Sequence, residues 1–143
     1  MAKKRVNNQN ATVLCIDFGK TNIGTALGRN SLVTPLEVIS GKDMDTALFK
    51  INRLIVENKV DRLVVGLPLT PDDKETAQSL ETRRFAKILK ATTKRPVDFQ
   101  NEYETTRAAL SEAIDIDVSE KGRGSVDHLA AAFILKNYYN ERS

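Results

Sequence analysis

The chain has 143 residues, of which 41% are hydrophobic and 29% are charged, and its formal net charge at pH 7 is +3. This length and balance are typical of one globular domain with its own core, and they exclude a disordered chain. The small excess of positive charge is compatible with a nucleic-acid partner without requiring one.

The first ten residues are polar and contain three basic side chains. We expect residues 1–10 to be a disordered lead, with a nucleic-acid-binding arm as the alternative, and residues 11–143 to form a single domain. No apolar stretch follows that could serve as a signal peptide or a membrane span. The lone Cys15 lies in an apolar run, which predicts a buried, inert thiol and a reducing, cytoplasmic compartment.

The hydrophobic periodicity predicts strands and helices in a definite order. Apolar runs predict strands over Thr12–Ile16, Ile23–Leu27, Val33–Ile39, Leu63–Leu67 and Pro96–Gln100. Helical spacing predicts helices over Ala47–Ile55, Glu75–Thr92 and Thr105–Ala113, and a last one capped by Ser125 after a loop over Ile114–Gly124. Pro35 favours an edge position for the third strand, and Asp43 or Asp45 is the expected cap of the first helix.

Two helices have apolar faces that we expect to pack on the sheet. The faces are Ala77, Leu80, Phe85, Ile88 and Leu89 in one helix, and Val126, Leu129, Ala130, Phe133 and Ile134 in the last. A meander of three strands followed by helical crossovers gives an α/β fold, with a mixed five-stranded sheet flanked by helices.

Three carboxylates stand at the ends of these elements. Asp17 closes the first strand, Glu102 closes the last strand, and Asp127 falls in the first turn of the last helix. We expect them to converge at one edge of the sheet, where they would repel one another without a cation. Hard oxygen ligands of this kind suit Mg²⁺ or Mn²⁺, and two such ions about 4 Å apart can hydrolyse a phosphodiester.

Each residue also has a purely structural explanation. Asp17 could be a solvated turn residue, Glu102 part of a polar loop, and Asp127 an acid favoured by the helix dipole. The only histidine, His128, falls on the polar side of the last helix, so an exposed bystander is the default and a general acid the alternative.

Four segments resemble the motifs of the YqgF/RuvX nucleases, which belong to the ribonuclease-H-like superfamily. They are Asp17–Ala26, Val65–Leu69, Asn101–Thr106 and Val126–Ala131, in order and at suitable spacing over nearly the whole chain. The resemblance implies a ribonuclease-H-like domain and a metal-dependent endonuclease, with Asp17, Glu102 and Asp127 at the positions of the family's metal-binding carboxylates.

The family is associated with 5′-end maturation of 16S ribosomal RNA, and an earlier interpretation was a Holliday-junction resolvase. The resemblance therefore implies structured nucleic acid as the partner: precursor 16S rRNA or the small ribosomal subunit, bound by a monomer or homodimer. The chain departs from the family pattern in three places. A basic residue is common where Asn22 stands, Asn101 and Tyr103 replace the usual neighbours of Glu102, and the loop Thr70–Lys74 lacks the usual glycine. These departures bear on phosphate contacts.

Other functions remain open from the sequence. A DNA-junction resolvase would need the same carboxylates, and a non-catalytic RNA- or ribosome-binding module would not use them. Asp17–Asn22 also resembles a phosphate loop of the actin and sugar-kinase ATPases, but these need two domains. For contacts to a nucleic-acid backbone, the best candidates are Lys20, which lies beside Asp17, and Lys121 and Arg123, which precede Asp127. A solvated helix face explains the basic residues between Arg83 and Lys90 more economically.

Overall fold

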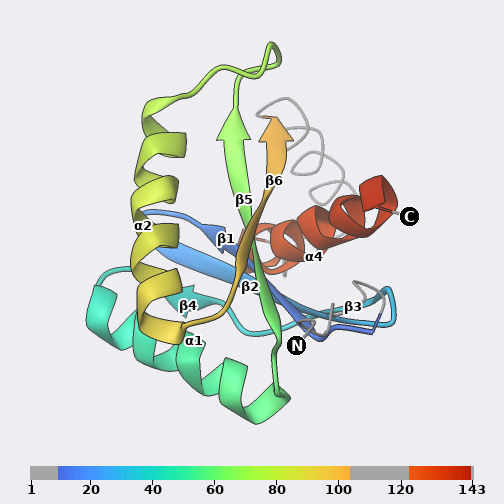
Figure 1. The fold of residues 1–143 in the computed structure, drawn as a ribbon. Coiled ribbons are helices and arrows are strands. Elements are labelled where there is room, and N and C mark those ends of the chain that lie inside the picture. The colour runs from blue at the N-terminus through green and yellow to red at the C-terminus, as the bar shows by residue number, and fades with distance from the viewer. Residues whose placement is uncertain (1–9, 104–122, 143) are drawn as a thin grey trace, which may run out of the picture.

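A computed structural model describes residues 10–103 and 123–142 of the chain. Its elements are β1 (Val13–Phe18), β2 (Asn22–Arg29), β3 (Leu32–Pro35), β4 (Ile39–Ser40), α1 (Met44–Asn58), β5 (Arg62–Leu69), α2 (Ala77–Thr93), β6 (Val97–Tyr103) and α4 (Arg123–Arg142). The strands form one sheet in the order β3-β2-β1-β5-β6, with β4 also beside β2. β1 and β6 run parallel to β5, and β2 runs antiparallel to β1. Helices α1 and α2 lie on one side of the sheet and α4 on the other (Figure 1), which confirms the predicted α/β architecture.

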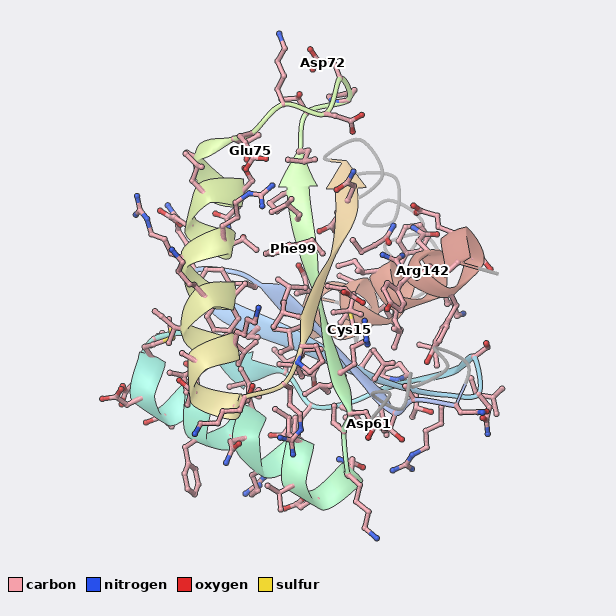
Figure 2. The ribbon with its side chains drawn as sticks, viewed as in Figure 1. Cys15, Asp61, Asp72, Glu75, Phe99 and Arg142 are labelled. Carbon is pink, nitrogen blue, oxygen red and sulfur yellow. The ribbon has the colours of Figure 1, made fainter. Side chains whose placement is uncertain are left out.

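The central strands β1 and β5 are buried on both sides, because helices cover both faces of the sheet. Leu14 and Ile16 of β1 pack with α1 and α2, whereas Val13 and Cys15 pack under α4. This alternation is the two-residue period of a strand. Cys15 is fully buried near the middle of the sheet (Figure 2), as predicted.

The third predicted strand is two short strands, so the prediction of five strands misses one. β3 ends at Pro35, which has no N–H to continue the ladder, and β4 begins at Ile39 opposite Ile23. Pro35 does lie on an edge strand, since β3 ends the strand order. The cap of α1 is Asp43, whose Oδ1 accepts from the Asp45 N–H at 3.2 Å.

β5 continues through Pro68, although the sequence pattern ends it at Leu67. The ladder between β1 and β5 stops at the pair Ile16 and Val65, so Pro68 breaks no pairing on the β1 side. β6 accompanies β5 to Leu69. The strands that carry the candidate site therefore extend together to the carboxyl edge of the sheet.

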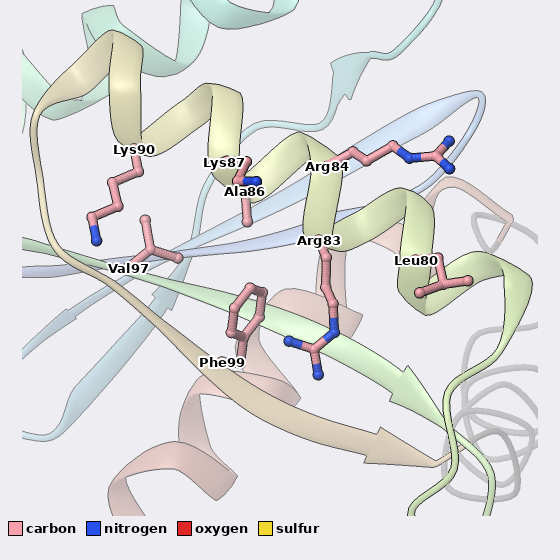
Figure 3. A pocket seen from close by; sticks show the side chains of 8 residues that line it. All are labelled: Leu80, Arg83, Arg84, Ala86, Lys87, Lys90, Val97 and Phe99. Carbon is pink, nitrogen blue, oxygen red and sulfur yellow. The ribbon is translucent and has the colours of Figure 1, made fainter.

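The predicted apolar face of α2 is wrong at three positions. Leu80 and Ile88 are 48% and 44% exposed, and Ala77 is exposed as well. Phe85 and Leu89 define the buried line, which small residues extend: Ser79, Thr82, Ala86 and Thr93. Leu80 instead borders a groove of about 520 Å³ between α2 and β6 (Figure 3).

The last helix begins earlier than predicted, because Arg123 and Gly124 are already helical and Ser125 therefore does not cap it. Its buried residues on the sheet are Ala130, Ala131, Ala132, Ile134, Leu135, Tyr138 and Tyr139, whereas Leu129 and Phe133 are only half-buried. The predicted helix over Thr105–Ala113, most of the loop after it and the N-terminal lead lie outside the described residues. Within the described parts of the chain, no helix has both the length and the apolar character to cross a membrane.

Candidate active site

Asp17 and Glu102 lie on the two strands that flank β5. Because β1, β5 and β6 are mutually parallel, their carboxyl ends meet at one edge of the sheet. Asp17 is the last residue but one of β1, and Glu102 is the last but one of β6, opposite Pro68. Both carboxylates therefore stand near the carboxyl edge.

The two carboxylates also share one face of the sheet. Asp17 follows Cys15 by two residues, and Cys15 packs under α4, so the strand period directs Asp17 to the α4 side. Gly66 stands between the two strands on the same face: a Cβ atom there would lie 3.2 Å from Glu102 Oε2 and 2.7 Å from Ile134 Cδ1 of α4. The bare backbone of Gly66 therefore leaves room for Glu102 beneath the last helix.

Both acids are nearly shielded from water. Asp17 is 4% exposed and Glu102 is 9% exposed. Burial, and then the charges of Asp17 and Glu102, raise the pKa of the Cys15 thiol well above its ordinary value. The carboxylate oxygens of Asp17 and Glu102 are hard donors, the kind that Mg²⁺ and Mn²⁺ prefer.

Asp98, on the same face of β6 as Glu102, has a structural role instead. Asp98 Oδ2 accepts from Arg62 Nη1 at 2.7 Å and from the Tyr138 hydroxyl at 2.6 Å. Burial raises the pKa of Asp98, but the hydrogen bonds from Tyr138 and Arg62 outweigh it and lower the pKa overall. Asp98 fastens the C-terminal part of α4 to the sheet, and it provides a contrast to the two acids at the carboxyl edge.

Asp127 lies in α4, but its side chain is outside the described residues, as is that of Arg123. The path of the helix is clear, however. Tyr139 crowds Gly28 in β2, opposite the amino end of β1, while Ile134 crowds Gly66 nearer the carboxyl edge. α4 thus runs with its N-terminal half toward that edge. The backbone of Asp127 is about two turns before Ile134 along the helix.

The turn between β1 and β2 places Lys20 at the same edge. Lys20 is exposed, two residues after the end of β1. The turn is tight, because a Cβ atom at Gly19 would lie 2.6 Å from the Asn22 carbonyl oxygen. Gly41 supports it, donating its N–H to Thr21 O at 2.8 Å. Lys121, by contrast, lies outside the described residues.

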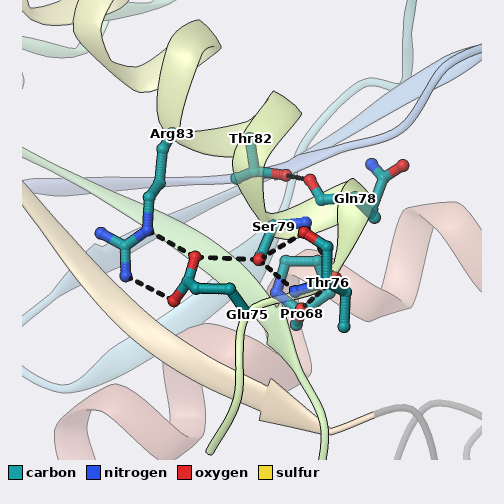
Figure 4. A network of polar contacts seen from close by, with 7 residues as sticks. All are labelled: Pro68, Glu75, Thr76, Gln78, Ser79, Thr82 and Arg83. Carbon is teal, nitrogen blue, oxygen red and sulfur yellow. Dashed lines mark hydrogen bonds and ion pairs between the residues drawn. The ribbon is translucent and has the colours of Figure 1, made fainter.

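A polar network holds the loop that follows β5 (Figure 4). The Thr76 hydroxyl donates to Pro68 O at 2.9 Å and also caps α2 by accepting from the Ser79 N–H at 2.9 Å. Glu75 accepts two hydrogen bonds from Arg83, at 2.8 and 2.9 Å. These contacts fix the exit of β5 beside the candidate site.

Gly66 falls within the Val65–Leu69 motif, and nothing in the local sequence indicates its role. Its role becomes visible only once the neighbouring strand and helix are in place. Among the described side chains no group of three or more potential metal ligands occurs, and Asp127, the third predicted ligand, is not among those side chains.

Comparison with known proteins shows to which family the chain belongs. The family model described as RuvX, Holliday junction resolvase, matches residues 11–141. A relative from Nitrosospira multiformis, provisionally named a pre-16S rRNA nuclease, is 35% identical over 147 aligned positions, covering 99% of this chain and 96% of the relative. A Roseiflexus relative with the same name is 32% identical, covering 96% and 99%.

Two solved structures share the fold at low sequence identity. Thermus thermophilus RuvC in complex with a Holliday junction substrate is 14% identical with a TM-score of 0.53, covering 94% of this chain and 98% of RuvC. The fowlpox virus Holliday junction resolvase is 16% identical with a TM-score of 0.54, covering 92% and 99%. The ribonuclease-H-like fold predicted from the sequence is thereby confirmed.

Proposed function

This chain belongs to the RuvX family, a family of nucleases, and from that premise we propose that it is a metal-dependent endonuclease whose metal ligands are Asp17, Glu102 and Asp127. The observation that carries the proposal is the pair of buried carboxylates on one sheet face, with Gly66 between their strands. Buried carboxylates need charge partners, and a divalent cation is one partner that two carboxylates on the same sheet face can share.

The donor set fits a hard divalent ion. Carboxylate oxygens are hard ligands and suit Mg²⁺ or Mn²⁺. The course of α4 supports Asp127 as the third ligand, because the helix runs from Ile134 back toward the carboxyl edge. When bound, such ions activate water and stabilise the leaving oxygen of a phosphodiester.

The rest of the site positions the substrate and excludes water. α4 covers the sheet face beside Gly66, and both carboxylates stand near the carboxyl edge of the sheet. Lys20, exposed at that edge, is a candidate for backbone phosphate contact, and we retain Lys121 and Arg123 in the same role. Contacts of this kind set affinity and register, not sequence preference.

For the substrate we propose structured RNA, with 5′-end maturation of precursor 16S rRNA as the reaction. The names of the two relatives that match this chain over almost their whole length support this choice. A cytoplasmic location and contact with the small ribosomal subunit follow from such a substrate, and a monomer or homodimer would serve it. The second candidate is a Holliday-junction resolvase, which the family description favours.

One experiment separates these possibilities. The purified chain is incubated with precursor 16S RNA or with a DNA four-way junction, in Mn²⁺, Mg²⁺ or EDTA, beside an Asp17→Asn variant. We expect metal-dependent cleavage of the RNA that the variant lacks. Cleavage of the junction alone would favour the resolvase. Equal cleavage by the variant would reject the proposed site, and binding of the RNA without any cleavage would favour a non-catalytic binding module.

A further inference from the structure

A second surface of interest lies on the opposite face of the sheet from the two carboxylates. It is the groove of about 520 Å³ between α2 and β6, which we call the α2–β6 groove (Figure 3). Its lining is apolar at Leu80, Ala86, Val97 and Phe99, and basic at Arg83, Arg84, Lys87 and Lys90. Neither Asp17 nor Glu102 lines it, so its role is separate from the proposed chemistry.

The basic charge is concentrated on this helix. Residues 77–94 contain five basic residues and one acidic residue, a net charge of +4, whereas the whole chain carries +3. Arg83 is occupied, since it pairs with Glu75 and its guanidinium lies 5.2 Å from the centroid of the Phe99 ring. Lys87 and Lys90 are exposed and form no ion pair with any residue in the described ranges. The groove therefore has cations available for an acidic partner.

The other wall of the groove is a sheet edge. β6 ends the strand order, and β5 is its only strand partner among the described residues. An edge strand directs alternate N–H and C=O groups outward, and another extended chain can pair with them. When an extended peptide pairs with an edge strand that lies beside a helix, every second side chain of the peptide points into the groove between that strand and the helix.

We infer that the α2–β6 groove binds an extended segment of a partner protein, rich in acidic and aliphatic residues, which adds to the sheet beside β6. The backbone edge supplies hydrogen bonds, Leu80 and Val97 supply apolar surface, and Lys87 and Lys90 supply the charge complementarity.

Two other occupants fit less well. Single-stranded nucleic acid uses open aromatic faces for base stacking, and the Arg83 guanidinium lies over the ring of Phe99. A second copy of this chain, paired edge to edge through β6, would bring two basic α2 helices together, and like charges oppose this.

The test uses the full chain and a blocked synthetic peptide as long as β6, seven residues, with the repeat Val-Val-Glu-Glu. This repeat puts both residue types on each face of an extended peptide. Fluorescence anisotropy measures affinity, and amide hydrogen exchange measures protection of β6. We expect binding that protects β6 amides and weakens at high salt.

Matched variants assign the binding to the groove. Lys87→Glu/Lys90→Glu should weaken it about tenfold or more. Lys42→Glu/Lys136→Glu, which makes the same charge change at exposed sites elsewhere, should leave it unchanged. The same peptide with every backbone amide N-methylated should not bind, because it cannot pair with a strand edge.

Several outcomes would overturn the inference: no binding at millimolar peptide, equal loss in both double variants, or no protection of β6. If oligouridine instead binds more tightly than the peptide and depends on Lys87 and Lys90, the surface is a nucleic-acid contact. If sedimentation shows a dimer that Lys87→Glu/Lys90→Glu dissociates, the occupant is a second copy. Loss of nuclease activity in Asp17→Asn bears on none of these results.

Discussion

Gly66 on β5 lies so close to Glu102 on β6 that a Cβ atom at position 66 would come within 3.2 Å of Glu102 Oε2. The same Cβ atom would lie 2.7 Å from Ile134 Cδ1, so α4 also rests on this glycine. The missing side chain thus has two effects that can be separated: it lets the helix approach the sheet, and it leaves space for a buried carboxylate.

We predict that Gly66→Ala lowers both stability and metal affinity. The added methyl group collides with Ile134 and crowds Glu102, and overpacking of this kind costs about 1–3 kcal/mol in the free energy of unfolding. Chemical denaturation measures the first effect, and calorimetric titration with Mn²⁺ measures the second.

The double variant Gly66→Ala/Ile134→Val distinguishes the two effects. Valine lacks the Cδ1 atom that meets the new methyl group at 2.7 Å, so stability should recover, while the 3.2 Å approach to Glu102 remains and Mn²⁺ binding should stay weak. If metal affinity recovers together with stability, Gly66 serves only the packing of α4.

We predict that Asp17→Asn abolishes cleavage and leaves the fold intact. The variant lacks a charged ligand for the metal that would activate water, so the rate should fall by at least about 10²-fold. Asparagine has nearly the same shape as aspartate, so the metal-free variant should keep its fold, and its melting temperature should not fall. Wild-type activity in a variant with a matched melting curve would exclude Asp17 from the reaction.

Asp98→Asn is the matched control, because it is the same substitution on the same sheet face. Asp98 holds Arg62 and Tyr138 at 2.7 and 2.6 Å, so this variant should lose about 1–3 kcal/mol of stability yet retain cleavage in the presence of metal. A pattern in which both variants lose activity equally would point to general disruption of the sheet face.

Much of this architecture could be predicted from local sequence patterns. Asp17 closes a buried apolar run and Glu102 closes the last predicted strand. Strands separated by a helix are predicted to be parallel, so their carboxyl ends meet. The errors occur where tertiary contacts decide. Leu80 and Ile88 fit a helical apolar face, but Phe85 and Leu89 set the rotation of α2 and leave both exposed.

The role of Gly66 could not be predicted for a related reason. A glycine inside a strand indicates a close approach without saying what approaches. Here a side chain of α4 and a carboxylate of β6 both do, and neither is near Gly66 in sequence. Asp98 is similar, since nothing local marks it as the partner of Tyr138, 40 residues later.

We predict that Tyr138→Phe destabilises the protein at neutral pH but not in strong alkali. Burial and the hydrogen bond to Asp98 raise the pKa of Tyr138 from 10.0 to about 12. A group whose folded pKa is raised stabilises the fold below its unfolded pKa, and this contribution is lost as pH rises through the folded value. The difference in unfolding free energy between wild type and variant should therefore shrink from about pH 10 to about pH 12. A constant difference across this range would contradict the assignment.

The last prediction joins metal binding to stability. A divalent ion that binds only the folded state raises the free energy of unfolding by RT ln(1 + [L]/Kd), about 2.7 kcal/mol at about 100-fold excess over Kd. Mn²⁺ should therefore raise the melting temperature, at least as strongly as Mg²⁺, and the rise should shrink in Asp17→Asn and Glu102→Gln. It should also weaken in acid, where protons compete for the carboxylates, and NaCl at equal ionic strength should not reproduce it.

If millimolar Mn²⁺ leaves the wild-type melt unchanged, the titration is repeated with a short RNA duplex. A response only with RNA means that the site assembles on its substrate, whereas no response in either titration would reject the metal centre and favour a non-catalytic binding module.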